Sequence, residues 1–132
     1  MKTKLKFILF TFFLGLLLIS SCTDSTEDPG DNIQKYTGEW NVNDESARIN
    51  YKVIISANPS NSTEILMQNF ADLGGSAVAL VIGNNLALDT QPLGSDYTII
   101  GSGSYINSNK LVINFDLNDG IDNEPRIATF TR

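Results

Sequence analysis

Carboxylates are the main side chains in this sequence that could carry out chemistry. The chain has 15 acidic residues and no histidine, and a dense acidic run, DLNDGIDNE, occupies residues 116–124. Such runs are typical of calcium loops, in which glycine occupies position six and glutamate position twelve. Counted from Asp116, this run places glycine at position five and glutamate at position nine. We therefore interpret it as a polar hairpin turn at Asp119-Gly120 and predict no metal site.

The other reactive groups do not form the common catalytic sites. A chain without histidine lacks Ser-His-Asp and Cys-His nucleophilic sites and His/Cys zinc sites. No glycine-rich phosphate loop precedes a helix. A glycosidase needs two carboxylates across a cleft, which a small β domain hardly provides. We predict no enzymatic activity, no catalytic residue and no cofactor.

The one cysteine, Cys22, follows a segment typical of a secretory signal. Three lysines lie in residues 1–6, and residues 7–19 form an uncharged run of 13 residues. A helix of that length rises about 20 Å, which is short of the ~30 Å hydrocarbon core. Ile19-Ser20-Ser21-Cys22 resembles the lipobox of bacterial lipoproteins. The resemblance implies that residues 1–21 are removed as a signal peptide and that Cys22 is acylated, which anchors the protein in a membrane. The alternative is a free cysteine in an uncleaved helix.

The segment after Cys22 is acidic and poor in apolar residues. Residues 23–34 hold four acids, no base and one appreciably apolar residue, Ile33. Because such a segment cannot fold by itself, residues 22–34 are predicted to be the lipidated cysteine and a flexible tether. The acids also resemble the export signal that sends some Gram-negative lipoproteins to the surface of the outer membrane. After cleavage the formal charge is −9, which argues against nucleic-acid binding.

Alternation of apolar and polar residues dominates residues 35–132. RINYKVIIS at 48–56 and KLVINFDLN at 110–118 both place apolar residues on one face. Shorter strand patterns occur at TGEWNV, TEILMQNF, SAVALVI, NLALD, DYTIIGSGSY and PRIATFTR, with turn residues between them. The best helical candidate is a single turn near 69–73. The sequence predicts one all-β domain: an antiparallel meander of about eight strands that closes into a small barrel.

The first strand suggests a family. Tyr36-Thr37-Gly38-Glu39-Trp40 resembles the opening Gly-x-Trp of lipocalins and related calycin barrels, although this chain is short and lacks their helix and disulfide. The resemblance implies a lipocalin-like barrel that binds a small, often apolar ligand. It also implies a late basic residue lying across the Trp ring, for which Arg126 and Arg132 are candidates. The candidate ligand-lining residues are Trp40, Tyr51, Ile99, Tyr105 and Phe115.

Two glycines bear on whether a cavity exists. Gly101 and Gly103 share a strand face between Ile99 and Tyr105. Their missing side chains either open room for a ligand or let the strand bend and an aromatic ring such as Trp40 pack closely. We favour the second interpretation.

Two functional hypotheses remain. The first is a binding module that holds a small apolar ligand, because eight strands enclose space that side chains just fill or that admits one small ligand. The second is a solid barrel that serves as a platform for another envelope protein or a glycan. Bulky inward residues such as Trp40 and Phe115 count against a cavity. Both hypotheses describe an exported, lipid-anchored envelope protein, expected at the outer membrane and exposed on the surface.

Overall fold

The structure, a computed structural model, describes residues 29–132. The predicted signal peptide (residues 1–21), the predicted acylation site Cys22 and residues 23–28 of the predicted tether lie outside the described residues. The described chain forms a short α-helix, eight strands and a 3₁₀ turn: α2 (Pro29–Gln34), β1 (Gly38–Asp44), β2 (Ile49–Ala57), β3 (Glu64–Gln68), η1 (Phe70–Asp72), β4 (Ser76–Ile82), β5 (Asn85–Leu93), β6 (Tyr97–Asn107), β7 (Lys110–Asn118) and β8 (Asn123–Thr131).

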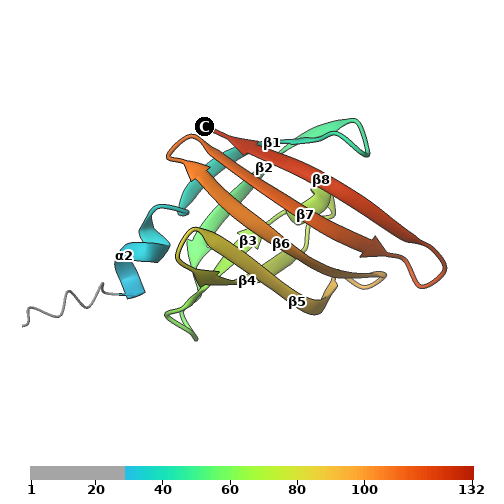
Figure 1. The fold of residues 1–132 in the computed structure, drawn as a ribbon. Coiled ribbons are helices and arrows are strands. Elements are labelled where there is room, and N and C mark those ends of the chain that lie inside the picture. The colour runs from blue at the N-terminus through green and yellow to red at the C-terminus, as the bar shows by residue number, and fades with distance from the viewer. Residues whose placement is uncertain (1–28) are drawn as a thin grey trace, which may run out of the picture.

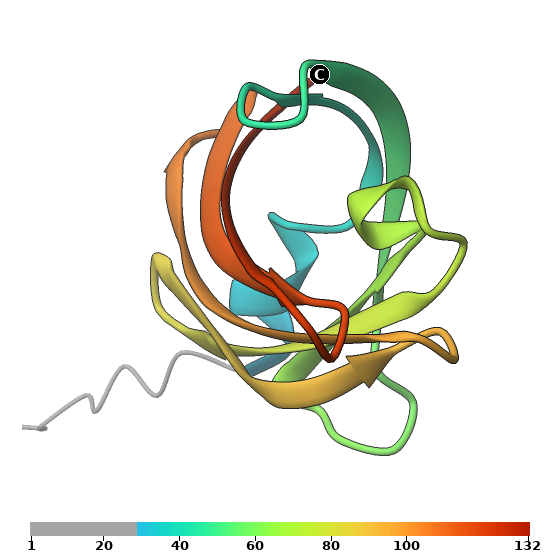
Figure 2. The ribbon, with the colours of Figure 1, turned by 90° about the vertical axis from the view of Figure 1, so that its right-hand side faces the viewer.

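The predicted all-β meander and its closure are both confirmed. Each strand pairs antiparallel with the next, and β1 pairs with β8 to complete an eight-stranded barrel (Figures 1 and 2). The closing pairs run from Asn41 opposite Thr131 to Asp44 opposite Ala128. Within residues 29–132, closure gives every strand a partner on both sides, which protects the sheet against edge-to-edge aggregation.

Alternation along the strands builds one continuous core. On β1, for example, Trp40, Val42 and Asp44 are buried while the residues between them are exposed. Each large apolar side chain buried in this way contributes about 1.5–3 kcal/mol. The core includes side chains from all eight strands and the segments at both ends, among them Tyr36, Trp40, Tyr51, Ile55, Met67, Phe70, Leu88, Ile99, Ile113, Phe115 and Phe130.

Gly101 of β6 allows this strand to pack closely against β7. A Cβ atom at this position would lie 2.7 Å from Cβ of Phe115 and would also collide with the carbonyl oxygen of Asn114. Gly103 similarly lies against Ile113 and Leu86. The absent side chains therefore make room for neighbouring residues of β5 and β7, and the residue packed against Gly101 is Phe115, through its Cα and Cβ, instead of Trp40.

Where the backbones of β4 and β5 stop pairing, the side chain of Gln91 bonds to the backbone of β4. Backbone pairing between these strands ends at Leu80 and Ala87, and the register of β5 against β6 shifts between Leu88 and Gln91. Gln91 spans the gap: its Oε1 accepts from the Val78 amide at 2.7 Å, and its Nε2 donates to the Val78 carbonyl at 2.8 Å. One amide side chain thus replaces two ladder bonds.

The folded domain begins earlier than residue 35. Residues of the predicted tether form α2, and Ile33 is only 4% exposed because it packs into the core cluster. The segment could not bury Ile33 by itself, because it has no other large apolar side chain. The burial of Ile33 therefore depends on the barrel. Within residues 29–132, no helix has the length and apolar character needed to cross a bilayer.

Candidate functional site

The barrel has two ends with different side chains. We call the end that carries α2, the 83–84 and 108–109 turns and the C-terminus the α2 end. The opposite end, formed by turns 45–48, 69–75, 94–96 and 119–122, is called the far end (Figure 1). Figure 2 views the barrel from the far end, with α2 behind the ring of strands.

The α2 end is closed by aromatic side chains from the chain that follows α2. The indole Nε1 of Trp40 donates to the Tyr36 carbonyl at 2.8 Å, and the Tyr36 hydroxyl donates to the Gly83 carbonyl at 2.9 Å. Both side chains are fully buried. Burial, with a smaller contribution from Tyr105, raises the pKa of Tyr36 to about 12. The ring of Tyr105 meets that of Tyr36 edge-on, with centroids 5.3 Å apart.

Two cations cover these rings. Cζ of Arg132 lies 4.0 Å from the centroid of Trp40, and its guanidinium donates to the carbonyls of Lys35, Thr37 and Ser108 at 2.6–2.9 Å. Nζ of Lys35 lies 4.9 Å from the ring centroid of Tyr105 and donates to Oδ1 of Asn84 at 2.6 Å. Of the two bases predicted for the Trp stack, the structure brings Arg132 to the ring. Such contacts contribute about 0.5–2 kcal/mol.

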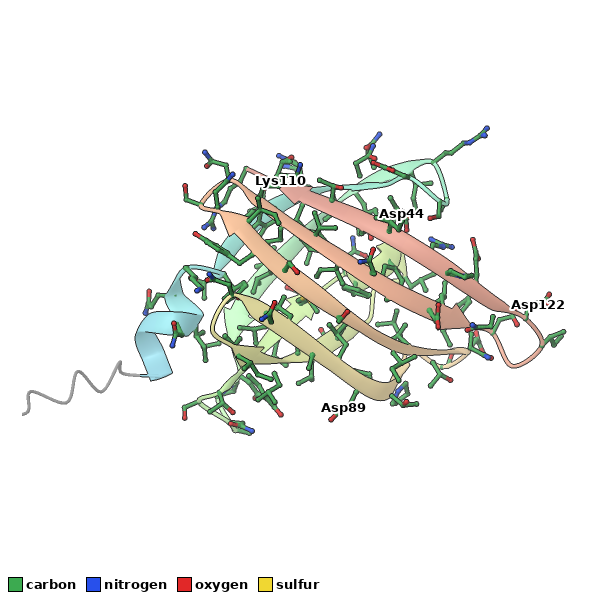
Figure 3. All side chains as sticks on the ribbon, in the orientation of Figure 1. Asp44, Asp89, Lys110 and Asp122 are labelled. Carbon is green, nitrogen blue, oxygen red and sulfur yellow. The ribbon has the colours of Figure 1, made fainter. Side chains whose placement is uncertain are left out.

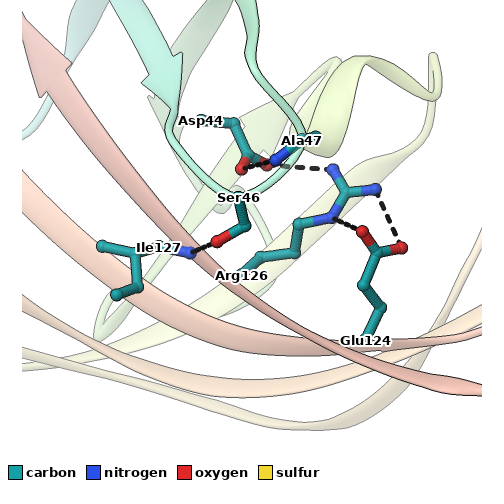
Figure 4. Close-up of polar contacts among 6 residues, drawn as sticks. All are labelled: Asp44, Ser46, Ala47, Glu124, Arg126 and Ile127. Atoms are coloured by element: carbon teal, nitrogen blue, oxygen red, sulfur yellow. Dashed lines mark hydrogen bonds and ion pairs between the residues drawn. The ribbon is translucent and has the colours of Figure 1, made fainter.

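Arg126 lies at the far end in a partly buried ion-pair cluster (Figure 4). Its Nη1 donates to Oδ2 of Asp44 at 2.9 Å, and its Nε lies 3.1 Å from Oε1 of Glu124. Asp44 is fully buried, and its other oxygen accepts from the Ala47 amide at 3.0 Å, which holds the β1–β2 turn. Burial lowers the pKa of Arg126, but the bonds to Asp44 and Glu124 outweigh it and raise the pKa overall.

A tyrosine hydroxyl is buried beside this cluster without a hydrogen-bond partner. Tyr51 is 8% exposed, and burial followed by the charge of Asp44 raises its pKa far above the usual value. Arg126 and the Ala71 amide oppose the rise, although the amide does not meet hydrogen-bond geometry with the hydroxyl. Among residues 29–132, the cluster therefore holds two buried side-chain atoms without a hydrogen bond, the Tyr51 hydroxyl and Nε of Arg126, of which Nε keeps its ion-pair contact with Glu124.

The loop beside Tyr51 carries backbone strain. The one helical turn expected at 69–73 is present as η1, but Asn69, Ala71 and Asp72 have φ near 60°. Non-glycine residues rarely adopt this region, and such strain often lies at functional sites. Asn69 compensates in part, because its side chain donates to the Lys52 carbonyl and accepts from the Gly74 amide. Phe70 and Ala71 stay buried and close this side of the far end.

The β7–β8 turn is rigid and exposes an apolar side chain at its tip. Asp119 Oδ1 accepts from the amides of Ile121 and Asp122 at 2.9 and 2.7 Å, and Gly120 takes a positive φ of 91°. These bonds lower the pKa of Asp119. The predicted Asp119-Gly120 hairpin turn is thus confirmed. Ile121 is 90% exposed on this turn.

A small hollow of about 150 Å³ lies at the far end. It is lined by apolar, acidic and basic side chains: Leu73, Tyr97, Leu117, Asp119, Asp122, Glu124 and Arg126. Its Arg126 and Glu124 are already paired, and Asp119 serves the turn. Within residues 29–132, no three acidic side chains gather closely enough to hold a metal ion.

Three other hollows are open grooves on the outer wall. The largest, about 540 Å³, crosses β6, β7 and β8 between Ile100 and Ile127, and the others measure about 300 and 400 Å³. Their exposed lining is more apolar than polar, and in the largest groove Ile100 and Ile127 lie beside polar residues such as Ser102, Asn114 and Asp116. All three grooves are open to solvent.

The predicted ligand-lining residues lie in different surroundings. Trp40, Tyr51, Ile99 and Phe115 belong to the buried core cluster, in which Phe115 packs against Phe70 with ring centroids 4.7 Å apart. Tyr105 is half-buried at the α2 end and packs against the same cluster, whereas the Tyr51 hydroxyl points to the far-end ion pair. None of the four hollows described is lined by more than one of these five side chains.

The partner of Arg126 was missed in the sequence, although a signal existed. Asp44 continues the inward alternation of Trp40 and Val42, and an acid on an inward face needs a partner. Arg126 occupies the same inward face of the last strand as Ala128 and Phe130. In sequence comparisons, no protein-family model matches the chain, and no curated protein matches it significantly.

Proposed function

We propose that this chain is a non-enzymatic, lipid-anchored protein of the cell envelope that acts as an interaction platform for another envelope protein or a glycan. In this proposal residues 1–21 are removed and Cys22 is acylated, with the outer membrane as the site of anchoring. The lipobox-like sequence before Cys22 supports the anchor. The observation that carries the platform is the packed interior, closed by Trp40 at one end and by the Asp44–Arg126 pair at the other.

The far end offers the better contact surface for a partner. Ile121 is almost fully exposed on a turn whose shape Asp119 fixes. Burying such a side chain against a partner contributes about 1.5–3 kcal/mol. Because the turn is already ordered, little conformational entropy is lost on binding. Acids surround Ile121 on this turn, so the partner is expected to present an apolar patch with a polar or basic border.

A small ligand is the second candidate, favoured by the lipocalin resemblance and by the hollow at the far end, which Arg126 lines. Ligand pockets usually enclose about 300–1,000 Å³. The far-end hollow has about 150 Å³, and its charged groups are mostly paired with one another. This volume disfavours the ligand hypothesis.

Native mass spectrometry of the full-length protein, gently extracted from the membranes of the cell that makes it, tests the proposal. We expect a chain that lacks residues 1–21, carries acyl groups on Cys22 and retains a bound protein or glycan. Ile121→Ser should lower occupancy by the companion at least about tenfold, since burial of one isoleucine corresponds to a factor of that size. The matched control is Ile54→Ser, which removes a half-exposed isoleucine from the barrel wall.

Three outcomes would contradict the proposal in different ways. An uncleaved, unacylated chain would remove the anchor. A releasable small-molecule mass in place of a companion would favour the ligand hypothesis. Equal loss of the companion in Ile121→Ser and Ile54→Ser would remove the far end as the contact surface.

A further inference from the structure

The α2 end carries exposed apolar side chains that the core does not use. Ile82 at the end of β4 and Ile106 near the end of β6 are 58% and 54% exposed. Ile82 pairs with Asn85 of β5, and Asn85 pairs with Ser104 of β6, so both isoleucines lie on the same side of this end. Both point outward, because their strand neighbours Val81 and Tyr105 pack against the core.

Charge is distributed unequally between the two ends. Lys35, Lys110 and Arg132 lie at the α2 end. The acids there are Asp31 of α2, Glu39, which pairs with Lys52, and Glu64. The far end carries six acids in addition to Asp44 (Glu45, Asp72, Asp96, Asp119, Asp122 and Glu124) and two bases, Arg48 and Arg126. Figure 3 shows Lys110 toward the α2 end and Asp122 on the opposite turn. An anionic surface would therefore repel the far end more strongly than the α2 end.

Chain length limits how far the α2 end can lie from a membrane. Six residues lie between Cys22 and Pro29, where α2 begins, which makes seven Cα–Cα steps. Seven steps of backbone span at most about 25 Å. β6 alone has 11 residues, which corresponds to about 35 Å along the strand. An anchor on Cys22 therefore holds the α2 end closer to the lipid than the far end.

We propose that the α2 end docks on the bilayer that holds the acylated Cys22, with Ile82 and Ile106 in the headgroup layer and the three cations beside lipid phosphates. Exposed apolar side chains next to lysine and arginine are the combination that binds membrane interfaces. This inference rests on the proposed acylation. It gives the anchored barrel a fixed orientation, with Ile121 and the acidic turns directed away from the lipid.

The orientation is testable in the acylated full-length protein. Acylation occupies the thiol of Cys22, so Ile106→Cys and Asp122→Cys each supply one labelling site for an environment-sensitive fluorophore. The proteins are reconstituted in vesicles of phosphatidylethanolamine and phosphatidylglycerol that contain a headgroup nitroxide. We expect quenching at position 106 to exceed that at position 122 at least about threefold, because an interfacial side chain lies within about 5–10 Å of the headgroup boundary.

Removing the isoleucines should loosen the contact. With the label at Lys110→Cys, the double substitution Ile82→Ser and Ile106→Ser should reduce quenching about twofold or more. The matched control, Ile100→Ser with Ile127→Ser, removes two isoleucines of 49% and 46% exposure from the barrel wall and should leave quenching unchanged. Circular dichroism verifies that each variant is folded.

Intact mass separates failure of this inference from failure of the anchor. Acylated protein with equal quenching at positions 106 and 122 would overturn the docked orientation and leave the anchor in place. Protein that reaches the membrane fraction without acyl groups would overturn both, since the tether argument needs Cys22.

Discussion

At the α2 end the barrel is closed by an indole ring beneath a guanidinium, whereas at the far end a buried carboxylate is paired with a guanidinium inside the wall. Trp40 and Arg132 meet through a ring face, and every hydrogen bond of that arginine ends on a backbone carbonyl. Asp44 and Arg126 meet as opposite charges, with Asp44 fully buried. The first closure depends mainly on packing, the second on complete pairing of charge.

The difference extends to the segments around each closure. Both closures join residues that are distant in sequence, since Arg132 bonds to the carbonyl of Lys35, 97 positions away, and Arg126 bonds to Asp44, 82 positions away. The far end also includes a loop that has three non-glycine residues at positive φ. A strained, charge-paired end should be the easier one to open locally, because fewer apolar contacts oppose its motion.

The largest effect is expected from removal of the packed ring. Trp40→Ala should lower the free energy of unfolding by about 3–5 kcal/mol, because it leaves a cavity and frees Arg132. Urea denaturation followed by circular dichroism measures the loss, since Trp40 is the chain's one tryptophan and its fluorescence disappears with it. Should Trp40→Ala fail to fold, Trp40→Phe keeps a ring and should lose less. A loss below about 1 kcal/mol in Trp40→Ala would show that packing does not close this end.

At the far end, removal of the buried carboxylate should cost about 2–3 kcal/mol. Asp44→Ala leaves Arg126 paired with Glu124 alone and frees the Ala47 amide. The double variant Asp44→Ala with Arg126→Met should be more stable than Asp44→Ala, because it leaves no buried charge and the Glu124 carboxylate is half exposed to solvent. Additive losses in a double-mutant cycle by urea denaturation would contradict a direct coupling between the two side chains.

Two tyrosines allow a like-for-like comparison of the ends. Tyr36→Phe should cost about 1 kcal/mol, because it removes the bond from the hydroxyl to the Gly83 carbonyl. Tyr51→Phe should be neutral or stabilising, because its buried hydroxyl lacks a partner. Thermal unfolding of the two variants gives the contrast directly. An equal loss in both would mean that Tyr51 is hydrogen-bonded in solution.

The same tyrosines predict a loss of stability at alkaline pH. The pKa of Tyr36 is raised to about 12 from a usual value of 10, so the unfolded chain loses its proton before the folded chain does. Stability should therefore be complete below pH 10 and fall as the pH rises toward 12. Tyr51, whose pKa is also raised, acts in the same direction. Denaturant midpoints between pH 9 and 12 should fall less steeply in Tyr36→Phe, and identical slopes would contradict the assignment.

Strand alternation and turn residues were sufficient to predict the barrel, because period-2 patterns and hairpin signals are local. The same patterns could not decide which of Arg126 and Arg132 lies over Trp40. The two residues are six positions apart, so alternation places them on the same face of the last strand and its continuation. Antiparallel pairing of β1 with β8 resolves it: the start of β1 must lie near the end of the chain, and Asp44 pairs with Ala128, two residues after Arg126. A closed topology is therefore needed before single residues can be paired.

Other features depend on contacts that no local pattern encodes. Ile33 alone could not indicate that α2 packs onto the barrel, because Ile33 is buried only by side chains of the folded barrel. Gln91 bridges two strands through a side chain, which appears in sequence as an ordinary polar residue. The positive φ of Ala71 could not be predicted from the sequence either, since alanine usually avoids this region.

The smallest effect is expected in the β7–β8 turn of the far end. Asp119→Ala removes the acceptor for the Ile121 and Asp122 amides and should slightly lower the unfolding midpoint at neutral pH. Those amide bonds lower the pKa of Asp119, so its contribution is present above its usual pKa of 3.8 and is lost as the pH falls through the lower folded value. The difference between wild type and Asp119→Ala should therefore shrink in acid. Asp122→Ala removes the same charge from the same turn but keeps both amide bonds, and an equally large effect there would assign the loss to charge instead of turn geometry.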